Sequence, residues 1–345
     1  MKAFIAKEPG KAEFVDVKKP EVGPGEILAK VAYAGICATD IALITGETTF
    51  VREGLAKYPI RIGHEWAGVV TEVGADVKTI RPGDHVIGDS GVACFDCPTC
   101  WSGDVGHCPK VKSVGTINTY DGCFAEYMKM PERLTYKLDP EIDLKEAALI
   151  EPASIAMHGI RKSGARFGDK VLVIGTGAIG LTAVGLLKAI GCTVVLVGRR
   201  ESKLKIGKRM GADYLVNSSE QNVVEELSKL TESGRFGTVM ESSGNIDVLY
   251  ECGQYVKGGG NVVLLGFYEQ NIPNFNIDQF IVNDISLLGV AGSAATMPGI
   301  IELLRTKKVS FEPLVSAVYD FDQAPFAVER VIQNEGDRIK VLLKF

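Results

Sequence analysis

The sequence predicts an α/β protein of two domains, one built on a doubly wound parallel sheet and one formed mostly of β-strands. Its 345 residues exceed what one ordinary hydrophobic core accommodates. From Gly168 to about Gly292, short apolar runs alternate with helical patterns, which is typical of parallel strands joined by crossover helices. Residues 1–150 instead hold short apolar runs separated by turns rich in glycine and proline, which indicate a small barrel or sandwich.

Residues 170–191, KVLVIGTGAIGLTAVGLLKAIG, carry the strongest local pattern. The β-branched run at 171–174 predicts one buried parallel strand, and a helical pattern runs from about Ala178 to Ile190. Glycines at G-x-G-x-x-G spacing join them, and the positive helix N-terminus favours a pyrophosphate. The segment therefore predicts a Rossmann dinucleotide-binding sheet. The residues expected to contact the cofactor are Gly175, Gly177, Ala178, Ile179 and Gly180.

The remaining pattern sets the expected domain boundaries. Parallel strands are expected at 171–174, 194–198, 214–216, 238–240, 261–265 and 285–290. A helix is expected at 297–307, and the final strand, Ile339–Phe345, is too short to form a third domain. We therefore expect it to complete the first domain. The prediction is a dinucleotide-binding domain at 153–292 and a mostly-β domain formed by 1–152 with 293–345.

Composition excludes several classes of function. The net charge of −5 offers no basic stripe for nucleic acid. No apolar window approaches the length of a membrane span, and the N-terminal stretch lacks the pattern of a signal peptide. We therefore expect a cytoplasmic protein without membrane or nucleic-acid partners. In that compartment the eight cysteines are expected to be metal ligands or buried thiols before disulfides.

Four of the cysteines lie close together in a loop, residues 94–108, with the spacing C-x2-C-x2-C-x7-C. Four thiolates at such spacing can close a tetrahedral Zn²⁺ shell, and a closed shell is structural because no position stays open for substrate. An iron–sulfur cluster and a pair of disulfides are the two alternatives. The expected ligands of this structural zinc are Cys94, Cys97, Cys100 and Cys108.

Several further motifs, each weak alone, occur in a specific order. These are C-A-T-D from Cys37, G-H-E-W-A-G-V-V from Gly63, D-G-C-F-A-E-Y from Asp121 and I-E-P-A-S-I-A-M-H-G from Ile150. Together with the cysteine loop and the glycine motif, they resemble the zinc-dependent medium-chain dehydrogenases, closest to the polyol (sorbitol-type) and threonine dehydrogenase branch. The resemblance covers nearly the whole chain and implies that the mostly-β domain is a GroES-like catalytic domain.

The resemblance implies a second, catalytic zinc. Cys37 and His64 would bind it, with Glu65 and Glu151 as the two candidates for the remaining carboxylate positions. The catalytic residues would be Cys37, His64, Glu65 and Thr39, whose hydroxyl would relay the proton of the substrate. Asp40 would orient a ligand or brace its loop. One departure from the family is Ala42, which stands where many relatives have a histidine that continues the proton path.

The end of the second predicted strand bears on which nicotinamide is used. NAD-specific sites usually have an acidic residue there, bonded to the ribose 2′-hydroxyl. This chain has Gly198, Arg199 and Arg200 instead. Each guanidinium group can hold the 2′-phosphate of NADP through two hydrogen bonds. The simpler alternative is that the two arginines only make the loop hydrophilic. The sequence favours NADP over NAD.

The sequence thus predicts an oxidoreductase that transfers hydride between NADP(H) and a secondary alcohol or ketone, with a polyol or sugar alcohol, phosphorylated or not, as the favoured substrate. An amino alcohol or aminocyclitol (threonine-like), or a simple ketone or aldehyde, is the alternative, and a non-catalytic cofactor sensor is the alternative of another class. The apolar strand at 285–290 lacks the charges that protect a free edge. We expect it to pair two subunits of a homo-oligomer, a dimer or a tetramer.

Overall fold

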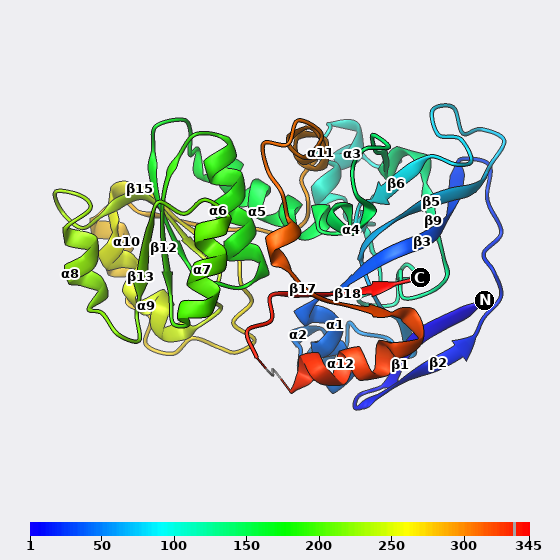
Figure 1. Ribbon diagram of the computed structural model, residues 1–345, viewed down its shortest axis with the longest axis horizontal. Coiled ribbons are helices and arrows are strands. Elements are labelled where there is room, and N and C mark those ends of the chain that lie inside the picture. The colour runs from blue at the N-terminus through cyan, green and yellow to red at the C-terminus, as the bar shows by residue number, and fades with distance from the viewer. Residues whose placement is uncertain (334–335) are drawn as a thin grey trace. The chain divides into compact units, whose positions relative to one another are not determined.

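The computed structural model describes residues 1–333 and 336–345. They form two compact units, drawn in Figure 1. The β-rich unit consists of Met1–Glu151, Gly292–Arg305 and Val315–Phe345, and the parallel-sheet unit of Pro152–Ala291 and Thr306–Leu314.

The parallel-sheet unit contains one six-stranded sheet in which every pair of neighbours is parallel. Its strand order, β13-β12-β11-β14-β15-β16, confirms the predicted doubly wound fold and places β16 at an edge. The strands are β11 (Lys170–Ile174), β12 (Thr193–Gly198), β13 (Tyr214–Asn217), β14 (Phe236–Glu241), β15 (Val256–Leu264) and β16 (Ser286–Gly289). The helices are α5 (Ile150–Ser163), α6 (Ala178–Ala189), α7 (Glu201–Arg209), α8 (Val223–Ser228), α9 (Ile246–Tyr255), α10 (Asp278–Val282) and the 3₁₀ turn η3 (Glu312–Leu314).

Helices cover both faces of this sheet, because its strands carry apolar side chains on both faces and both must be buried. One face packs Val195, Val239 and Val262 with Leu227 of α8 and Cys252 of α9 in a single buried cluster. The opposite face receives α7, whose Gly207 lies so close to the Leu196 side chain that a Cβ would meet it at 2.1 Å. Burial on both faces explains why these strands are almost uninterrupted apolar runs.

The β-rich unit holds a seven-stranded sheet of order β10-β6-β5-β3-β18-β17, with β9 also paired to β3, and a three-stranded sheet of order β2-β1-β4. Its strands are β1 (Lys2–Glu8), β2 (Lys11–Asp16), β3 (Glu26–Ile36), β4 (Ile60–Arg61), β5 (Glu65–Val73), β6 (His85–Gly88), β7 (Gly91–Val92), β8 (Lys112–Ser113), β9 (Tyr127–Pro131), β10 (Thr135–Lys137), β17 (Val315–Asp320) and β18 (Lys340–Lys344). Its helices are α1 (Ala38–Thr45), α2 (Thr49–Arg52), α3 (Pro98–Trp101), α4 (Leu144–Ala147), α11 (Met297–Arg305) and α12 (Ala324–Ile332), with 3₁₀ turns η1 (Val105–His107), η2 (Glu132–Leu134) and η4 (Phe321–Gln323).

The centre of the seven-stranded sheet brings together three distant parts of the chain. Strand β3 pairs with β5 on one side and with the C-terminal strand β18 on the other, both antiparallel. Phe4, Trp66 and Phe124 fill the core next to these strands and are almost fully buried. The end of β3, the start of β5 and the start of β18 therefore lie next to one another, and the candidate catalytic residues cluster there.

One segment groups differently from the sequence prediction. Residues 306–314, expected with the mostly-β domain, group with the parallel-sheet unit. Their 3₁₀ turn packs beside α6 and α7, and Glu312 accepts a hydrogen bond from Arg209 of α7 at 3.2 Å. Val309 lies against Gly185 of α6. These contacts hold the segment to the helices that cover the sheet.

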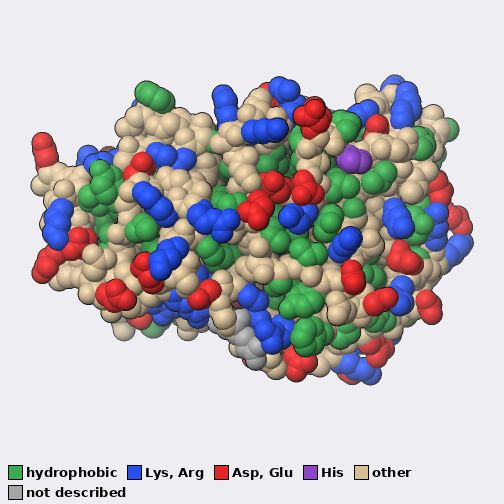
Figure 2. Space-filling model, in the orientation of Figure 1, with side chains coloured by type: hydrophobic (Ala, Val, Ile, Leu, Met, Phe, Trp, Pro, Cys, Tyr) green, Lys and Arg blue, Asp and Glu red, His purple; other side chains and the backbone are tan. Residues whose placement is uncertain are grey.

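Figure 2 shows acidic and basic side chains interspersed over the visible face, with no continuous basic stripe on it. Each helix in the described part of the chain is too short or too polar to span a lipid bilayer.

Candidate metal and cofactor sites

The first turn of α1 presents the residues of the C-A-T-D motif. Cys37 is the N-cap of the helix. The Asp40 carboxylate accepts a hydrogen bond from the Cys37 backbone N–H at 2.9 Å, in a capping-box arrangement. The other oxygen of Asp40 accepts the backbone N–H of Gly63 at 3.0 Å. Asp40 is fully buried, so its carboxylate fixes the loop that carries Cys37 and the loop that carries His64 to each other.

Glycines make room for the side chains that follow. Gly63 adopts φ +94°, and a Cβ there would meet the ring of Phe124 at 2.3 Å. Gly35 of β3 stands opposite Glu65 of β5, and a Cβ on Gly35 would lie 2.1 Å from the Glu65 carboxylate. Gly35 therefore leaves space for the Glu65 carboxylate, and Gly63 lets the backbone before His64 pack against Phe124 at a positive φ.

The structure brings Cys37, His64 and Glu65 together, with their ligand atoms all within 4.8 Å of one another. His64 and Glu65 are 7% and 1% exposed. His64 Nδ1 and Glu65 Oε2 are buried without a hydrogen-bond partner among the described residues. Because unpaired buried polar atoms are costly, these atoms call for a further partner. A thiolate, an imidazole and a carboxylate are ligands that Zn²⁺ prefers, so the set fits a zinc ion.

The electrostatics of the cluster also suit a cation. Burial lowers the pKa of His64, but the negative groups of Asp40 and Cys37 outweigh it and raise that pKa well above 6.5. His64 Nδ1 lies 3.6 Å from the Asp40 carboxylate, beyond hydrogen-bond distance. The field at this position therefore stabilises positive charge.

Glu151 takes a different position from Glu65. It lies in the first turn of α5, buried, and is not among the three residues whose ligand atoms converge. Burial raises the pKa of Glu151 to about 7, with His64 lowering it and Glu65 raising it. A hydrogen bond with Ser90 also lowers it. Glu151 thus lies close enough to feel the charges of the cluster without joining it.

Lys340, at the start of β18, is a residue of this cluster that the sequence analysis missed. Its ammonium donates to Glu65 Oε1 at 2.7 Å, and the side chain is buried. Burial opposes its charge, but Glu65 and Cys37 outweigh that effect and raise the pKa of Lys340 above 10.5. The available signal was a lysine directly before the apolar residues Val341–Leu343, in a strand expected to complete the first domain.

Thr39 lies in the first turn of α1, between Cys37 and Asp40 in the sequence, and is half-buried. Its hydroxyl makes no hydrogen bond with any residue that the structure describes. It is therefore available to a ligand at the start of the helix.

The four-cysteine loop forms a second cluster. The Sγ atoms of Cys94, Cys97, Cys100 and Cys108 all lie within 4.8 Å of one another, with Cys94 and Cys97 at 3.5 and 4.0 Å from Cys108. Zn–S bonds of about 2.3 Å in a tetrahedron give S···S distances of about 3.8 Å. All eight cysteines are free, so the disulfide alternative is wrong. The spacing fits a single tetrahedral ion.

Backbone donors support thiolates in this loop. Asp96 N–H points to Cys94 Sγ at 3.4 Å, Cys100 N–H to Cys97 Sγ at 3.5 Å, and Lys110 N–H to Cys108 Sγ at 3.4 Å. Such donors, with that of Cys94 first, lower the pKa of Cys108 to about 7, whereas burial and the neighbouring Cys97 and Cys108 raise the pKa of Cys100 to about 12. Donors aimed at sulfur stabilise the charged form that a metal requires.

The glycine motif lies in the strand–turn–helix context that the sequence predicts. Gly175 adopts φ +115°, and a Cβ on Gly180 would meet the Gly175 carbonyl at 2.2 Å, so both glycines serve the turn itself. Gly177 is the N-cap of α6, and a Cβ there would meet none of the described residues within 4 Å. Ala178 and Ile179 form the first turn of α6. The free helix N-terminus is shaped for an anion.

Gly198, Arg199 and Arg200 lie at the carboxyl end of β12, the neighbour of β11 in the sheet. A Cβ on Gly198 would meet Thr176 Cγ2 at 2.4 Å, so the two turns are in close contact. Both arginines are exposed, and Arg200 is the N-cap of α7. The end of β12 therefore presents guanidinium groups where an NAD site would have an acid.

Comparisons with known proteins agree with this geometry. Residues 23–140 match the alcohol dehydrogenase GroES-like domain, and residues 178–306 match the zinc-binding dehydrogenase domain. The chain is 30% identical to the sorbitol dehydrogenase of Bacillus subtilis, over 99% of this chain and 97% of that one. It is 32% identical to the L-threonine 3-dehydrogenase of Pyrococcus horikoshii, over 100% and 99%. A zinc-binding dehydrogenase from Sinorhizobium meliloti, solved with NADP bound, superposes with a TM-score of 0.90 at 29% identity and covers 100% of this chain and 99% of that one.

Both domain models match, in the order that the two folds require, and the relatives are covered almost from end to end. The chain belongs to the zinc-dependent medium-chain dehydrogenases, a family of oxidoreductases, in the branch of polyol and threonine dehydrogenases.

Proposed function

We propose that this chain catalyses the reversible NADP-dependent oxidation of a secondary alcohol, with a polyol or sugar alcohol as substrate, phosphorylated or not. The observation that carries the proposal is the buried convergence of Cys37, His64 and Glu65 within 4.8 Å, with Glu65 Oε2 unpaired among the described residues. A cofactor-binding sensor would not need a buried ligand set beside a half-buried hydroxyl, so this convergence favours an enzyme.

Cys37, His64 and Glu65 would hold a catalytic zinc, with Glu151 near it but not a ligand. A bound Zn²⁺ supplies a Lewis acid that favours loss of the hydroxyl proton, and a bound nicotinamide supplies the hydride acceptor. Thr39 relays the hydroxyl proton of the alcohol: its Oγ1 accepts that proton as its own hydroxyl proton passes on to water or to the cofactor ribose. Asp40 keeps Cys37 and His64 in place through its two backbone hydrogen bonds. Lys340 holds one oxygen of Glu65 and leaves the other free. Cys94, Cys97, Cys100 and Cys108 would hold a second, structural zinc.

The preference for NADP rests on the end of β12. Gly198 carries no side chain, and Arg199 and Arg200 can donate to a 2′-phosphate. No acidic residue stands at 198–200 to repel that phosphate. Gly175, Gly177, Ala178, Ile179 and Gly180 would contact the pyrophosphate and its neighbours.

The polyol assignment rests on acceptors near the metal ligands. Glu65 and Glu151 are both buried, and each contributes to the electrostatics around His64 or the other carboxylate. A vicinal hydroxyl or an amine can donate a hydrogen bond to one of these carboxylates in addition to its other contacts, whereas a simple alkanol has no second donor. The relatedness to L-threonine 3-dehydrogenases makes an amino alcohol the second candidate.

The deciding experiment compares kcat/KM for three matched substrates of the zinc-loaded protein with NADP: a polyol, its amino-alcohol analogue and a secondary alkanol of similar length. We expect the polyol to exceed the alkanol by tenfold or more. A preference for the amino alcohol selects the second candidate. A tenfold preference for the alkanol contradicts the polyol proposal.

We also propose that the protein is a homo-oligomer, a dimer or a tetramer, in which β16 of two copies pair. The strand is at the edge of the sheet, and its neighbour α10 exposes Ile281 and Val282 at 69% and 83%. Free apolar edges of this kind are otherwise prone to aggregation.

A further inference from the structure

The parallel-sheet unit has a second pocket that the proposed reaction does not use. It encloses about 290 Å³ and lies at the amino ends of β11, β14 and β15, which are neighbours in the sheet. The glycine-rich turn follows the carboxyl end of β11. A strand of five residues is about 16 Å long, so the pocket and the cofactor turn lie at opposite ends of the parallel strands.

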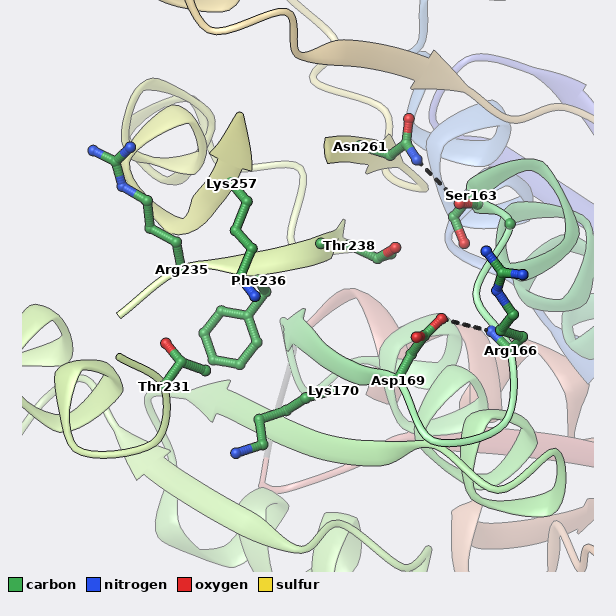
Figure 3. Close-up of a pocket in the computed structure, with 12 residues that line it drawn as sticks. Ser163, Arg166, Asp169, Lys170, Thr231, Arg235, Phe236, Thr238, Lys257 and Asn261 are labelled. Carbon is green, nitrogen blue, oxygen red and sulfur yellow. Dashed lines mark hydrogen bonds between the residues drawn. The ribbon is translucent and has the colours of Figure 1, made fainter. Parts of the chain in front are cut away.

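The lining of this pocket is strongly cationic. It includes Arg166, Lys170, Arg235 and Lys257, with Asp169 as its one acidic residue. Figure 3 shows Lys257 extending from its strand toward Phe236, Lys170 on the other side of Phe236, and Arg166 beside Asp169. Figure 3 also shows Arg235 extending away from the other labelled side chains, so Arg166, Lys170 and Lys257 are the cations considered for the cavity, and with Asp169 they leave a net charge of +2.

These cations are poorly compensated. Lys170 donates to the Leu230 carbonyl at 2.5 Å, which is neutral. Within residues 1–333 and 336–345, no carboxylate forms an ion pair with Arg166, Arg235 or Lys257. Elsewhere in the same unit, Lys188 pairs with Asp213 at 2.8 Å. Asp169 is partly committed, because its carboxylate accepts the Arg166 backbone N–H at 2.9 Å.

A neutral donor in the same cavity also lacks a partner. Thr231 Oγ1 is buried and makes no hydrogen bond with any described residue. Buried hydroxyls are almost always paired, so this one points to a missing acceptor. Lysine, arginine and a free hydroxyl can all donate, and an anion that accepts several hydrogen bonds satisfies them together.

The backbone places Lys257 in the cavity by an irregular register. Phe236 pairs with Val256 and Thr238 with Asn261, so two steps along β14 correspond to five along β15. Four residues, 257–260, therefore stand opposite the single residue Gly237, and they include Gly259 at φ +73°. Asn261 then closes the rim by donating to the Ser163 carbonyl at 3.0 Å. The bulge is what exposes Lys257 at the strand end.

We propose that this pocket is a second anion site that binds a small phosphate-bearing molecule. A phosphate carries up to two charges at neutral pH and three strong acceptor oxygens, which match the two lysines, Arg166 and the Thr231 hydroxyl. The site is independent of the alcohol and of the nicotinamide, because its residues lie at the amino ends of the strands, whereas the glycine-rich turn lies at the carboxyl end of β11.

The test uses the full-length zinc-loaded protein with saturating NADP, so that the glycine-rich turn is already occupied. Inorganic phosphate is titrated by calorimetry at low salt, and AMP in a second series reports whether a phosphate ester is accepted. We expect one saturable site per chain. Lys257→Gln should weaken phosphate binding about tenfold, since it removes one charge-assisted hydrogen bond. Thr231→Val, nearly isosteric, should weaken it severalfold with an unchanged melting temperature.

Lys308→Gln is the matched control, because Lys308 is exposed in the same unit but outside the pocket. Phosphate affinity should not change in this variant. The proposal fails if wild type shows no saturable binding up to tens of millimolar, or if Lys308→Gln weakens binding as much as Lys257→Gln. Binding of citrate with no binding of phosphate would overturn the phosphate class. Unchanged binding in Thr231→Val and Lys257→Gln would place the ion elsewhere.

Discussion

Lys340 and Glu65 form a buried ion pair, Nζ to Oε1 at 2.7 Å, between the first residue of the last strand and the first residue of β5. Their side chains are 5% and 1% exposed. A second weak contact joins Lys340 Nζ to the Ile36 carbonyl at 3.4 Å. The C-terminal strand is thereby tied to one of the proposed zinc ligands.

Replacing Lys340 with methionine should therefore destabilise the protein strongly. Removing one partner of a buried pair leaves the other charge unpaired, which costs about 3–5 kcal/mol. Lys344→Met is the matched control, because Lys344 is the exposed last residue of the same strand and should change stability by less than about 0.5 kcal/mol. Denaturant unfolding of the zinc-loaded proteins measures both. Equal stability of the two variants would show that the pair contributes nothing.

Replacing Thr39 tests the proton relay. Thr39→Ala should lower kcat/KM by about 10²–10⁴-fold, the usual contribution of a positioned proton-transfer group. Thr39→Ser keeps the hydroxyl and should retain most activity. The free energy of unfolding should change little in either, because the hydroxyl makes no hydrogen bond within the described chain. An alanine variant as active as the serine variant would remove Thr39 from the mechanism.

The cysteine loop should account for one of two zinc ions per chain. Cys97→Ser or Cys100→Ser should lower the melting temperature and reduce the zinc content from two to one, because binding of a structural metal is coupled to folding. Cys252→Ser, at a buried cysteine outside both clusters, should keep both ions. Elemental analysis of wild type that finds fewer than two zinc ions would contradict the assignment.

Cofactor preference should depend on the arginines after β12. Arg199→Ala and Arg200→Ala should each weaken NADP binding about tenfold or more, since a charge-assisted hydrogen bond contributes about 1.5–3 kcal/mol, and should leave NAD affinity nearly unchanged. Arg209→Ala, at the far end of α7 and paired with Glu312, is the control. Fluorescence titration with both reduced cofactors gives the dissociation constants. An equal loss for NADPH and NADH would disprove the role of the 2′-phosphate.

Subunit pairing should respond to the exposed apolar residues beside β16. Ile281→Glu introduces a charge at a 69% exposed position and should shift the protein toward monomer without a change in folding. Val224→Glu on α8, at 53% exposure, should leave the assembly intact. Light scattering at micromolar concentration measures both. A monomeric wild type would end the pairing hypothesis.

Local patterns predicted what is locally determined. The strand, turn and helix from Lys170 to Ala189 were expected almost to the residue, because the apolar run and the glycines act within a few positions. The cysteine loop is similar, since its ligands lie within 15 residues of sequence. Strand β15 begins at Val256, whereas the sequence predicted a start near Asn261. Three successive glycines have low strand propensity, so the sequence pattern did not indicate that this segment pairs with β14.

Contacts between distant segments were not predictable in the same way. Periodicity identifies neither Gly35, which is needed because Glu65 faces it across the sheet, nor Lys340, which is 275 residues from Glu65 along the chain. The joint position of Cys37, His64 and Glu65 was expected from family resemblance alone, since their side chains converge only after β3 and β5 pair. Sheet register, which is a tertiary property, decides these contacts.

The position of β18 also has a consequence for how the protein is made. A chain emerges from the ribosome with its N-terminus first, and domains generally fold as units in that order. All six strands of the parallel sheet end by Gly289, whereas the seven-stranded sheet lacks a central strand until residues 340–344 have been synthesised. During biosynthesis, β3 therefore carries an open edge beside Cys37 until residues 340–344 emerge, and a nascent chain that stalls before Lys340 would have its Glu65 carboxylate in place without its counterion.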